Sequence, residues 1–418
     1  HLNRHEVGTA GEVFTVIPHN RMGLASFARA QRLELRCRGD SCKTLPLFSK
    51  LHGHGLQVFV EVAQGQSQTQ AARHRAAGAC EGYDGRQIAD VVDLDGDGDP
   101  DEIHIRLEVA ELNGGSSLSP DPVTRYAIAP GIHPGLWVFA PKFVGMAVEN
   151  FESAEARYSL RLPSPALRIE QGDRVKIKLE NSHYMPHTLH LHGADHGFTD
   201  ADGEGNDGVP ITSEMPVLPG KARTYELTPR HAGTTFYHCH VQPHVHVMMG
   251  LQGLFIIEEN RPNNWLQTMN VGAGLVRAPS KAVAEAYDQE YDLHYQDLDQ
   301  QLSERIQREN DPRLITRSMH RQYDITDATS DFFTLNGRSF PYTFRESLVV
   351  GNESERIKLR VVNGGAKGIS LHTHGHKVTV THRDGVPVPP ASHSPQDTVW
   401  LATAQRVDLE LRLSNDGM

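Results

Sequence analysis

Several features that mark common protein classes are scarce in this chain of 418 residues. No apolar run reaches the roughly 18 residues that a membrane-spanning helix needs, so we expect no membrane span. Basic residues are in deficit, with 41 Lys and Arg against 52 Asp and Glu, and the net charge of −11 disfavours nucleic acid and anionic membranes as partners. An amino-terminal Met and a signal peptide are also lacking, so we expect a trimmed amino terminus.

Cysteine is rare, with four residues in the chain. Three of them, Cys37, Cys42 and Cys80, lie in the amino-terminal part, where one disulfide would form if the protein is exported. Their spacing leaves open which pair would form it.

Histidine, in contrast, is abundant and clustered, which suits a metalloprotein. The densest cluster is F-Y-H-C-H-V-Q-P-H-V-H-V-M-M at residues 236–249. Thiolate, thioether and imidazole together are ligands that copper prefers. If this run begins as a strand, successive side chains point to opposite faces. His238 and His240 would then share one face, and Cys239 would lie on the other.

A second cluster, P-H-T-L-H-L-H-G at residues 186–193, has a matching pattern. Strand alternation places His190 and His192 on one face and His187 on the other. The two clusters therefore predict two adjacent metal sites. One would contain His187, Cys239 and His244, and the other would contain His190, His192, His238 and His240.

These H-x-x-H-x-H-G and H-C-H-x-x-x-H-x-x-x-x-M runs resemble the copper motifs of the multicopper oxidases, in the laccase-like, bacterial type whose type 1 copper lies in the earlier copper domain. The resemblance implies a type 1 copper held by His187, Cys239, His244 and Met249. Met248 is an alternative axial ligand. His246 lies outside the pattern, so we expect it beside the site or exposed. His190, His192, His238 and His240 would supply half of a trinuclear cluster.

A third pair, His372 and His374, lies in S-L-H-T-H-G-H and would add trinuclear ligands. Ile369 stands where the earlier domain has His187, so we expect one type 1 copper in the chain. The family's cluster uses four H-x-H pairs, and three are found. The fourth would come from beyond Met418, if the chain is incomplete, from another chain in a trimer, or from His52 and His54.

The resemblance implies an oxidase with four coppers: one type 1, one type 2 and two type 3. It would couple one-electron oxidation of a substrate to the four-electron reduction of O2 to water, with Cys239, His238 and His240 as the catalytic link. The reductant would be a metal ion (Mn(II), Cu(I) or Fe(II)) or a phenol, at the imidazole edge of His187 or His244. We expect a periplasmic or extracellular location.

Two other functions use the same residue types. A copper nitrite reductase-like enzyme shares the fold and the type 1 site, but its pattern has histidine on only one side of the ligand cysteine, which His240 contradicts. A copper-binding or storage protein would use Met- and His-rich tracts without the matched alternation described above.

The run D-L-D-G-D-G-D-P-D at residues 93–101 indicates a different ion. Carboxylates at alternate positions with a glycine at the sixth reproduce the front of a calcium loop, in which hard oxygen ligands surround a hard cation. The loop resembles the short calcium loops of β-propeller repeats. The expected calcium ligands are Asp93, Asp95, Asp97, Asp99 and Asp101.

The fold class that we expect is all-β, with tandem cupredoxin-like Greek-key β-sandwiches. Residues 1–140 would form an amino-terminal β-rich domain, either a degenerate cupredoxin or another β fold. Residues 141–260 would form the cupredoxin domain with the type 1 copper, opening with a hairpin over 167–179. Residues 261–330 read as a partly helical linker, with helices over 281–287 and 298–309. Residues 331–418 would form a cupredoxin domain, incomplete as given.

Overall fold

The computed structural model divides the chain into two compact units, residues 1–73 and residues 74–418. It describes residues 3–6, 12–15, 31–34, 46–49, 93–115, 125–142, 160–264, 266, 268–270, 273–276 and 287–413. In the first unit the described residues form two antiparallel pairs: β1 (Asn3–Glu6) with β2 (Glu12–Thr15), and β3 (Gln31–Glu34) with β4 (Pro46–Ser49). The expectations for His52, His54 and the cysteines at 37, 42 and 80 lie outside the described residues.

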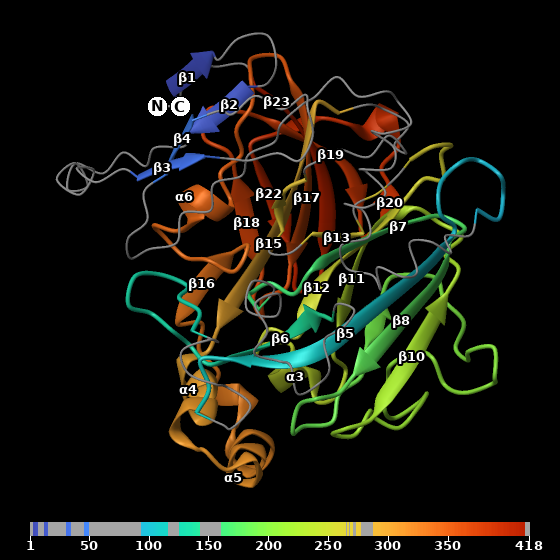
Figure 1. The fold of residues 1–418 in the computed structure, drawn as a ribbon, viewed down its shortest axis with the longest axis vertical. Helices are drawn as coiled ribbons and strands as arrows, with labels where there is room; N and C mark the ends of the chain where they lie inside the picture. Colours follow the sequence, from blue (N-terminus) through green and yellow to red (C-terminus); the bar gives the residue numbers. More distant parts are fainter. Residues whose placement is uncertain are drawn as a thin grey trace. The chain divides into compact units, whose positions relative to one another are not determined.

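The second unit contains a β-sandwich of two sheets (Figure 1). One sheet has the order β10-β8-β5-β6, formed by Ala222–Leu227, Arg174–Glu180, Glu102–Leu112 and Leu136–Pro141. The other has the order β13-β7-β12-β11-β9, formed by Met269–Asn270, Ala166–Glu170, Gln252–Glu258, Gly233–His238 and His190–His192.

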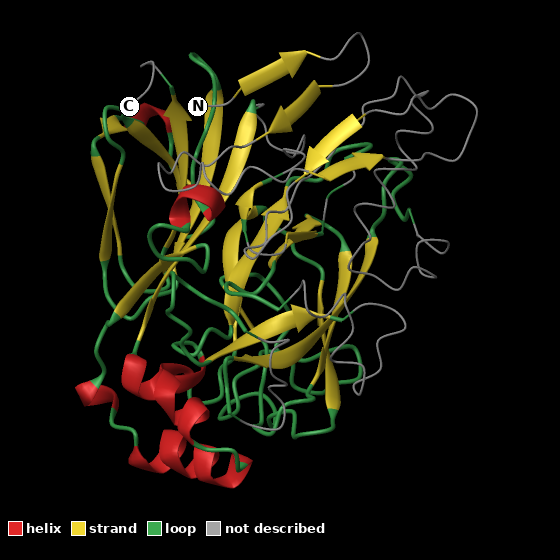
Figure 2. Ribbon diagram, turned by 60° about the vertical axis from the view of Figure 1, so that its left-hand side comes forward, coloured by secondary structure: helices red, strands yellow, loops and turns green. Residues whose placement is uncertain are grey.

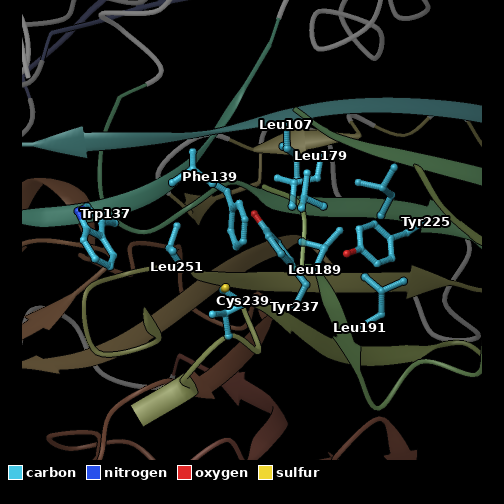
Figure 3. Close-up of a cluster of buried hydrophobic side chains, with 14 of the residues drawn as sticks. Leu107, Trp137, Phe139, Leu179, Leu189, Leu191, Tyr225, Tyr237, Cys239 and Leu251 are labelled. Atoms are coloured by element: carbon cyan, nitrogen blue, oxygen red, sulfur yellow. The ribbon is translucent and has the colours of Figure 1, made fainter. Parts of the chain in front are cut away.

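The hydrophobic core of this sandwich follows from the alternation of its strands. In β8, the alternate residues Val175, Ile177 and Leu179 are buried while the lysines between them are exposed, so one face of the strand packs inward. Leu167 and Ile169 of β7 belong to the same buried cluster. Figure 3 shows this cluster around Tyr237 and Leu179.

The expected hairpin over 167–179 is wrong. β7 pairs with β12 and β13, whereas β8 pairs with β10 and β5, so the two strands belong to different sheets. The turn between them does bend sharply at Gly172, whose φ is +99°. Alternation and a turn signal are the same for a hairpin and for a connection between two sheets, and only the pairing partners distinguish them.

The expected boundary at 140/141 does not separate two sheets. β5 pairs in parallel with β8 and antiparallel with β6, so residues 102–141 belong to the sandwich that carries the histidine clusters. Pro141 is the last residue of β6. Parallel pairing between strands far apart in the sequence leaves no local signal, so the sequence did not indicate that β5 and β8 pair.

The last part of the chain forms a second set of strands. Its main sheet has the order β14-β15-β17-β23-β19-β20, with β16 paired to β15 and β21 paired to β19, and a separate ladder joins β18 to β22. The bounds are β14 Gly274–Leu275, β15 Gln289–Leu298, β16 Phe332–Leu335, β17 Arg356–Asn363, β18 Ile369–His372, β19 Val378–Arg383, β20 Val386–Pro387, β21 Pro395–Gln396, β22 Thr398–Leu401 and β23 Arg406–Arg412.

The expected linker over 261–330 is only partly right. β15 lies inside it and is a central strand, paired to β17 along seven residues. Tyr291 and Leu293 of β15 face the hydrophobic core of the last domain, while Glu290 and Asp292 are buried on the other face. The charged residues in this strand made it resemble a solvated segment.

The helical part of the linker follows β15, at one end of the unit (Figure 2). α4 spans Gln300–Arg308, close to the helix expected over 298–309, and the Asp299 carboxylate caps it by accepting from the Leu302 N–H at 2.7 Å. α5 (Pro312–Arg317), the π-helical turn η4 (Ser318–Gln322) and the 3-10 turn η5 (Ile325–Asp327) follow. The remaining short helices are α3 (Pro243–His246), α6 (Thr343–Glu346) and η6 (Pro390–Ser392). No helix in the described part is long and apolar enough to cross a membrane.

A buried ion network joins the sandwich to the last domain. The Arg360 guanidinium, 2% exposed, donates to both oxygens of Glu258 at 2.9 and 3.0 Å, to Asp408 at 3.2 Å, and to Glu290. Burial alone would raise the pKa of Glu290, but Arg360 and Arg168 outweigh it and lower the pKa to about 2. The all-β prediction is confirmed, and the network keeps the strands of the two domains in contact.

Candidate metal centre

Cys239 directly follows β11 and points into the core of the sandwich. Its side chain is fully buried, and its backbone N–H donates to the Leu251 carbonyl at 3.0 Å. Figure 3 shows the sulfur inside the cluster formed by both sheets, close to Tyr237 and Leu251. The neighbouring residue His238 belongs to the opposite face, together with Phe236. The ring centroids of these two residues are 5.1 Å apart.

Three donors meet on the core side of this strand. Cys239 Sγ lies 3.6 Å from His187 Nδ1 and 3.3 Å from His246 Nδ1, and all three residues are fully buried. The predicted ligand His244 is exposed instead. The structure therefore brings His187 and Cys239 together, and adds His246, which we had expected beside the site or exposed.

The helix α3 explains this exchange. An α-helix turns by about 100° per residue, so that residues two apart lie on nearly opposite sides. His246 faces the core with Val245, and His244 faces solvent. The Leu251 N–H donates to the His246 carbonyl at 3.1 Å, which holds the end of the turn beneath the strand. The spacing taken from the family resemblance predicts His244 as the ligand, and this stays a prediction.

Hydrogen bonds fix which nitrogen of His187 faces the sulfur. The Met185 N–H donates to His183 Nδ1 at 3.3 Å, so this nitrogen is an acceptor. His187 Nε2 lies 2.9 Å from the same atom and must donate to it. His187 Nδ1 is then unprotonated, with its lone pair turned toward Cys239, which is the tautomer that a metal requires.

A buried polar wall stands behind His187. His183 Nε2 lies 3.8 Å from the Glu111 carboxylate, which accepts from the Tyr184 hydroxyl at 2.6 Å and from the Trp137 indole N–H at 3.2 Å. The Trp137 ring meets His187 and His246 edge-on, with centroids 6.2 and 5.2 Å away. This wall keeps water from the three donors. Apart from the four-residue spacing of His183 and His187, no sequence pattern indicated this wall.

The other side of the site is closed by His320 from η4. Its Nε2 lies 3.2 Å from His246 Nε2, and the two rings stack with centroids 5.3 Å apart. His320 is half-buried, whereas His246 is fully buried. The outer edges of both His187 and His246 therefore face another histidine rather than solvent. Nothing in the sequence linked His320 to a residue 74 positions away.

The protonation states of the site suit a soft cation. Burial lowers the pKa of His187 and His246 well below the usual value, so both imidazoles are neutral. Burial raises the pKa of the Cys239 thiol to about 11, so only a cation at this position would hold it as a thiolate at neutral pH. Met248 and Met249 are buried in the same cluster. Two imidazoles, one thiol and a thioether match a type 1 copper.

A second group lies on the opposite face of the strand. Donor atoms of His190, His192 and His238 all lie within 4.8 Å of one another. His190 stands opposite His238 in the ladder between β9 and β11. The His240 ring is 5.3 Å from that of His190 and 5.6 Å from that of His238. The four predicted histidines of this half-site are therefore neighbours.

Backbone carbonyls orient three of the predicted ligands in the same way. Nδ1 of His190 lies 2.6 Å from the Asp207 carbonyl, Nδ1 of His238 lies 3.0 Å from the Cys239 carbonyl, and Nδ1 of His372 lies 3.0 Å from the Asp397 carbonyl. A carbonyl only accepts, so each Nδ1 carries the proton and each Nε2 presents a lone pair. This is how the partners of metal-bound histidines usually fix them.

The acidic loop that ends at Asp207 also orients a histidine. The Asp207 carboxylate lies 3.4 Å from His190 Nδ1 and 3.4 Å from His196 Nε2. These three side chains could enclose an ion, but His190 Nδ1 already donates to the Asp207 carbonyl. The group therefore orients His190.

His372 and His374 remain apart from these groups. Their rings contact each other at 4.8 Å, both are exposed, and neither belongs to a group of three donors within 4.8 Å in the described part of the chain. Ile369, at the position of His187, packs against the core of the last domain. The structure thus presents this pair as an open half-site.

The part of the chain that carries these sites matches known proteins. Residues 152–262, which contain both groups around Cys239, match the family described as multicopper oxidase. Residues 152–262 are therefore a multicopper oxidase domain by this match. Among curated members, the iron transport multicopper oxidase of Saccharomyces cerevisiae is 24% identical over 272 residues, which is 61% of this chain and 34% of that protein. A multicopper oxidase of Staphylococcus aureus is 36% identical over 111 residues, 26% of this chain and 23% of that protein.

Solved multicopper oxidases share the fold. The blue copper oxidase of Nitrosomonas europaea matches with a TM-score of 0.53 and 22% identity, over 76% of this chain and 77% of that one. The multicopper oxidase mgLAC matches over the same shares, with a TM-score of 0.54 and 22% identity. The expected cupredoxin fold is thereby confirmed. The chain spans less than half the length of the curated relatives that it matches.

Proposed function

We propose that the chain is a copper-dependent oxidoreductase that takes single electrons from a reductant at a type 1 site and delivers them to O2. The observation that carries this proposal is the geometry at Cys239. The thiol faces His187 and His246, while the adjacent His238 faces His190 and His192 across the strand. One covalent step therefore connects the two donor sets.

The type 1 ligands that we propose are His187, Cys239 and His246, with Met249 or Met248 as the axial thioether. When bound, copper supplies one-electron redox chemistry at the thiol and O2 reduction at the histidine cluster. The chain's own residues supply neutral imidazoles, a dry pocket behind Trp137, and the covalent Cys239–His238 link. His320, half-buried beside His246, is the side from which we propose that electrons enter.

The histidine cluster that we propose includes His190, His192, His238, His240, His372 and His374. Support for the last two is the carbonyl-bound Nδ1 of His372, which matches His190 and His238. Further ligands would come from outside the described residues or from a second copy of the chain, as in a trimer. The mass of the copper-loaded protein in solution tests the oligomer.

We propose two candidate classes of reductant, metal ions and phenols. One curated relative is by name an iron transport oxidase and another is a laccase. The acidic balance of this chain favours cationic substrates such as Mn(II), Cu(I) or Fe(II). Comparison of kcat/KM for these ions and for a phenol decides between the classes. We also propose a periplasmic or extracellular location, which fractionation of the native cells tests.

The central experiment compares three variants of the copper-loaded protein. Cys239→Ser should remove the intense blue absorption of the Cu–thiolate bond. His372→Ala with His374→Ala should keep that absorption, and a reductant should still bleach it, but air should no longer restore it. His231→Ala, an exposed control, should behave as the original protein. Blue absorption that survives Cys239→Ser, or rapid recovery in air by the double variant, would overturn the proposal.

A further inference from the structure

A loop of alternating aspartates leads into β5 and belongs to neither copper site. Carboxylate oxygens of Asp93, Asp95 and Asp101 all lie within 4.8 Å of one another. The N–H groups of Gly96 and Gly98 donate to the two oxygens of Asp93, at 2.6 and 3.1 Å. The loop thus holds three negative groups at the mutual distance that ligands of one cation have.

Buried carboxylates of the loop itself and of the β7–β8 turn lie together here. Asp101 is 5% exposed, Asp99 is 2% exposed, and from the β7–β8 turn Glu170 is 3% and Asp173 is 2% exposed. Asp173 Oδ2 accepts from the Glu170 N–H at 2.6 Å, but its Oδ1 is buried without a hydrogen-bond partner. Oδ2 of Asp97 in the loop is in the same state.

No Lys or Arg within the described residues forms an ion pair with any of these carboxylates. A buried carboxylate without a partner costs several kcal/mol, so the group must either keep protons or hold a cation. Among the described residues, no basic side chain therefore compensates the negative charge that the sequence concentrates here.

We propose that the loop over 93–101 binds one calcium ion through Asp93, Asp95, Asp97 and Asp101, with the buried Asp173 carboxylate turned toward the same ion. All donors are oxygens, which suits calcium and excludes copper as the preferred ion. Asp99 was also expected as a ligand, but we leave it out of this set because its carboxylate accepts from the Asn264 N–H at 2.8 Å.

The ion would stabilise the contact between three segments that belong to the two sheets of the sandwich. Asn260 donates to Asp95 at 3.1 Å, and Asn263 donates through its N–H to the Asp97 carbonyl at 3.2 Å, so the segment after β12 lies against the loop. Gly98 makes this contact possible, because a Cβ there would meet Asn263 Oδ1 at 2.7 Å. Calcium would stabilise the start of β5, the β7–β8 turn and the end of β12 together.

The test is a calcium titration of the full chain after treatment with a chelator, followed by heat flow and by thermal unfolding. We expect one ion per chain, with a Kd between about 10⁻⁶ and 10⁻³ M. Saturation should raise the unfolding midpoint by roughly 2–8 °C. Asp93→Asn with Asp95→Asn, two exposed positions, should weaken binding at least 10-fold.

A matched control is Asp202→Asn with Glu204→Gln in the exposed acidic loop, which should bind calcium as the original chain does. Circular dichroism confirms that both double variants fold. The proposal is overturned if the original chain shows neither heat nor stabilisation up to millimolar calcium, or if the Asp93 and Asp95 variant binds as tightly as the control. Neither result depends on copper, so the oxidase proposal stands or falls separately.

Discussion

The sandwich and the last domain carry the same short motif in two different states. H-L-H-G at residues 190–193 and H-T-H-G at residues 372–375 both end in a glycine with positive φ, +86° at Gly193 and +74° at Gly375. Both hold the Nδ1 of the first histidine against a backbone carbonyl. In the sandwich, β11 stands opposite and supplies His238. In the last domain, β18 pairs with β22, whose Thr398 stands opposite His372.

This difference shows that the motif prepares a ligand but does not complete a site. The glycine and the carbonyl fix each imidazole locally, and both operate in either domain. Completion requires a facing strand that brings further donors, which the sandwich has in β11. His192 and His238 are consequently buried enough for their pKa values to fall to about 4 and about 3. His372 and His374 stay in solvent.

The largest effect that we expect concerns the contact between these two domains. Arg360→Met removes the guanidinium shared by Glu258, Glu290 and Asp408, leaving these buried carboxylates without their main partner. We expect a loss of about 3–5 kcal/mol in the free energy of unfolding, measured by urea denaturation. The exposed control Arg313→Met should change nothing measurable. An unchanged midpoint for Arg360→Met would mean that the domains are held together elsewhere.

The next effect tests which histidine completes the site at Cys239. His246→Ala should remove the blue absorption and weaken copper binding by more than about 100-fold, since a ligand costs more than the 10–100-fold typical of its hydrogen-bond partners. His244→Ala should leave both unchanged because His244 faces solvent. Competition with a copper chelator gives the two affinities. The reverse result would mean that His244 is the ligand, as the family spacing predicts. The position of α3 described above would then be wrong.

These two histidines mark how far the sequence could lead. Alternation along a strand predicted that Cys239 and His238 face opposite sides. This alternation, with a period of two residues, is a local property of the backbone. It could not predict that residues 243–246 turn as a helix, since four residues with one proline carry no periodicity. His320 and Glu111 reach the site through tertiary packing alone. β15 was missed because its buried acids are neutralised by Arg168 and Arg360, which lie far away in sequence.

A smaller effect tests the role of His320. His320→Phe keeps a ring beside His246 but removes the nitrogen 3.2 Å from it. We expect about 10-fold weaker copper binding, the lower range for a partner of a metal ligand, and slower bleaching by a reductant. His393→Phe, exposed in the last domain, is the control. Bleaching at the original rate with full copper affinity would show that electrons enter elsewhere and that the histidine pair is only packing.

The smallest effect concerns a buried histidine that holds no metal. His294 of β15 lies with its Nε2 3.2 Å from the Gln252 side-chain oxygen, and burial lowers its pKa to about 3. It stays neutral in the folded chain, whereas the unfolded chain binds a proton below about pH 6.5. Its contribution to stability is therefore complete above that pH and falls as the pH drops toward 3.

His294→Gln removes the titrating imidazole and keeps a side-chain N–H that can donate to the Gln252 oxygen. Between pH 7 and 6, the copper-free original chain should lose about 0.7 kcal/mol more stability than the variant. Denaturant unfolding at the two pH values measures the difference, and His231→Gln serves as the exposed control. Equal losses would mean that the pKa of His294 is the same in the folded and the unfolded chain. A difference of the expected size would show that burial alone lowers the pKa of a histidine, so that at His190 and His238 the oriented lone pairs, and not the low pKa, mark the metal ligands.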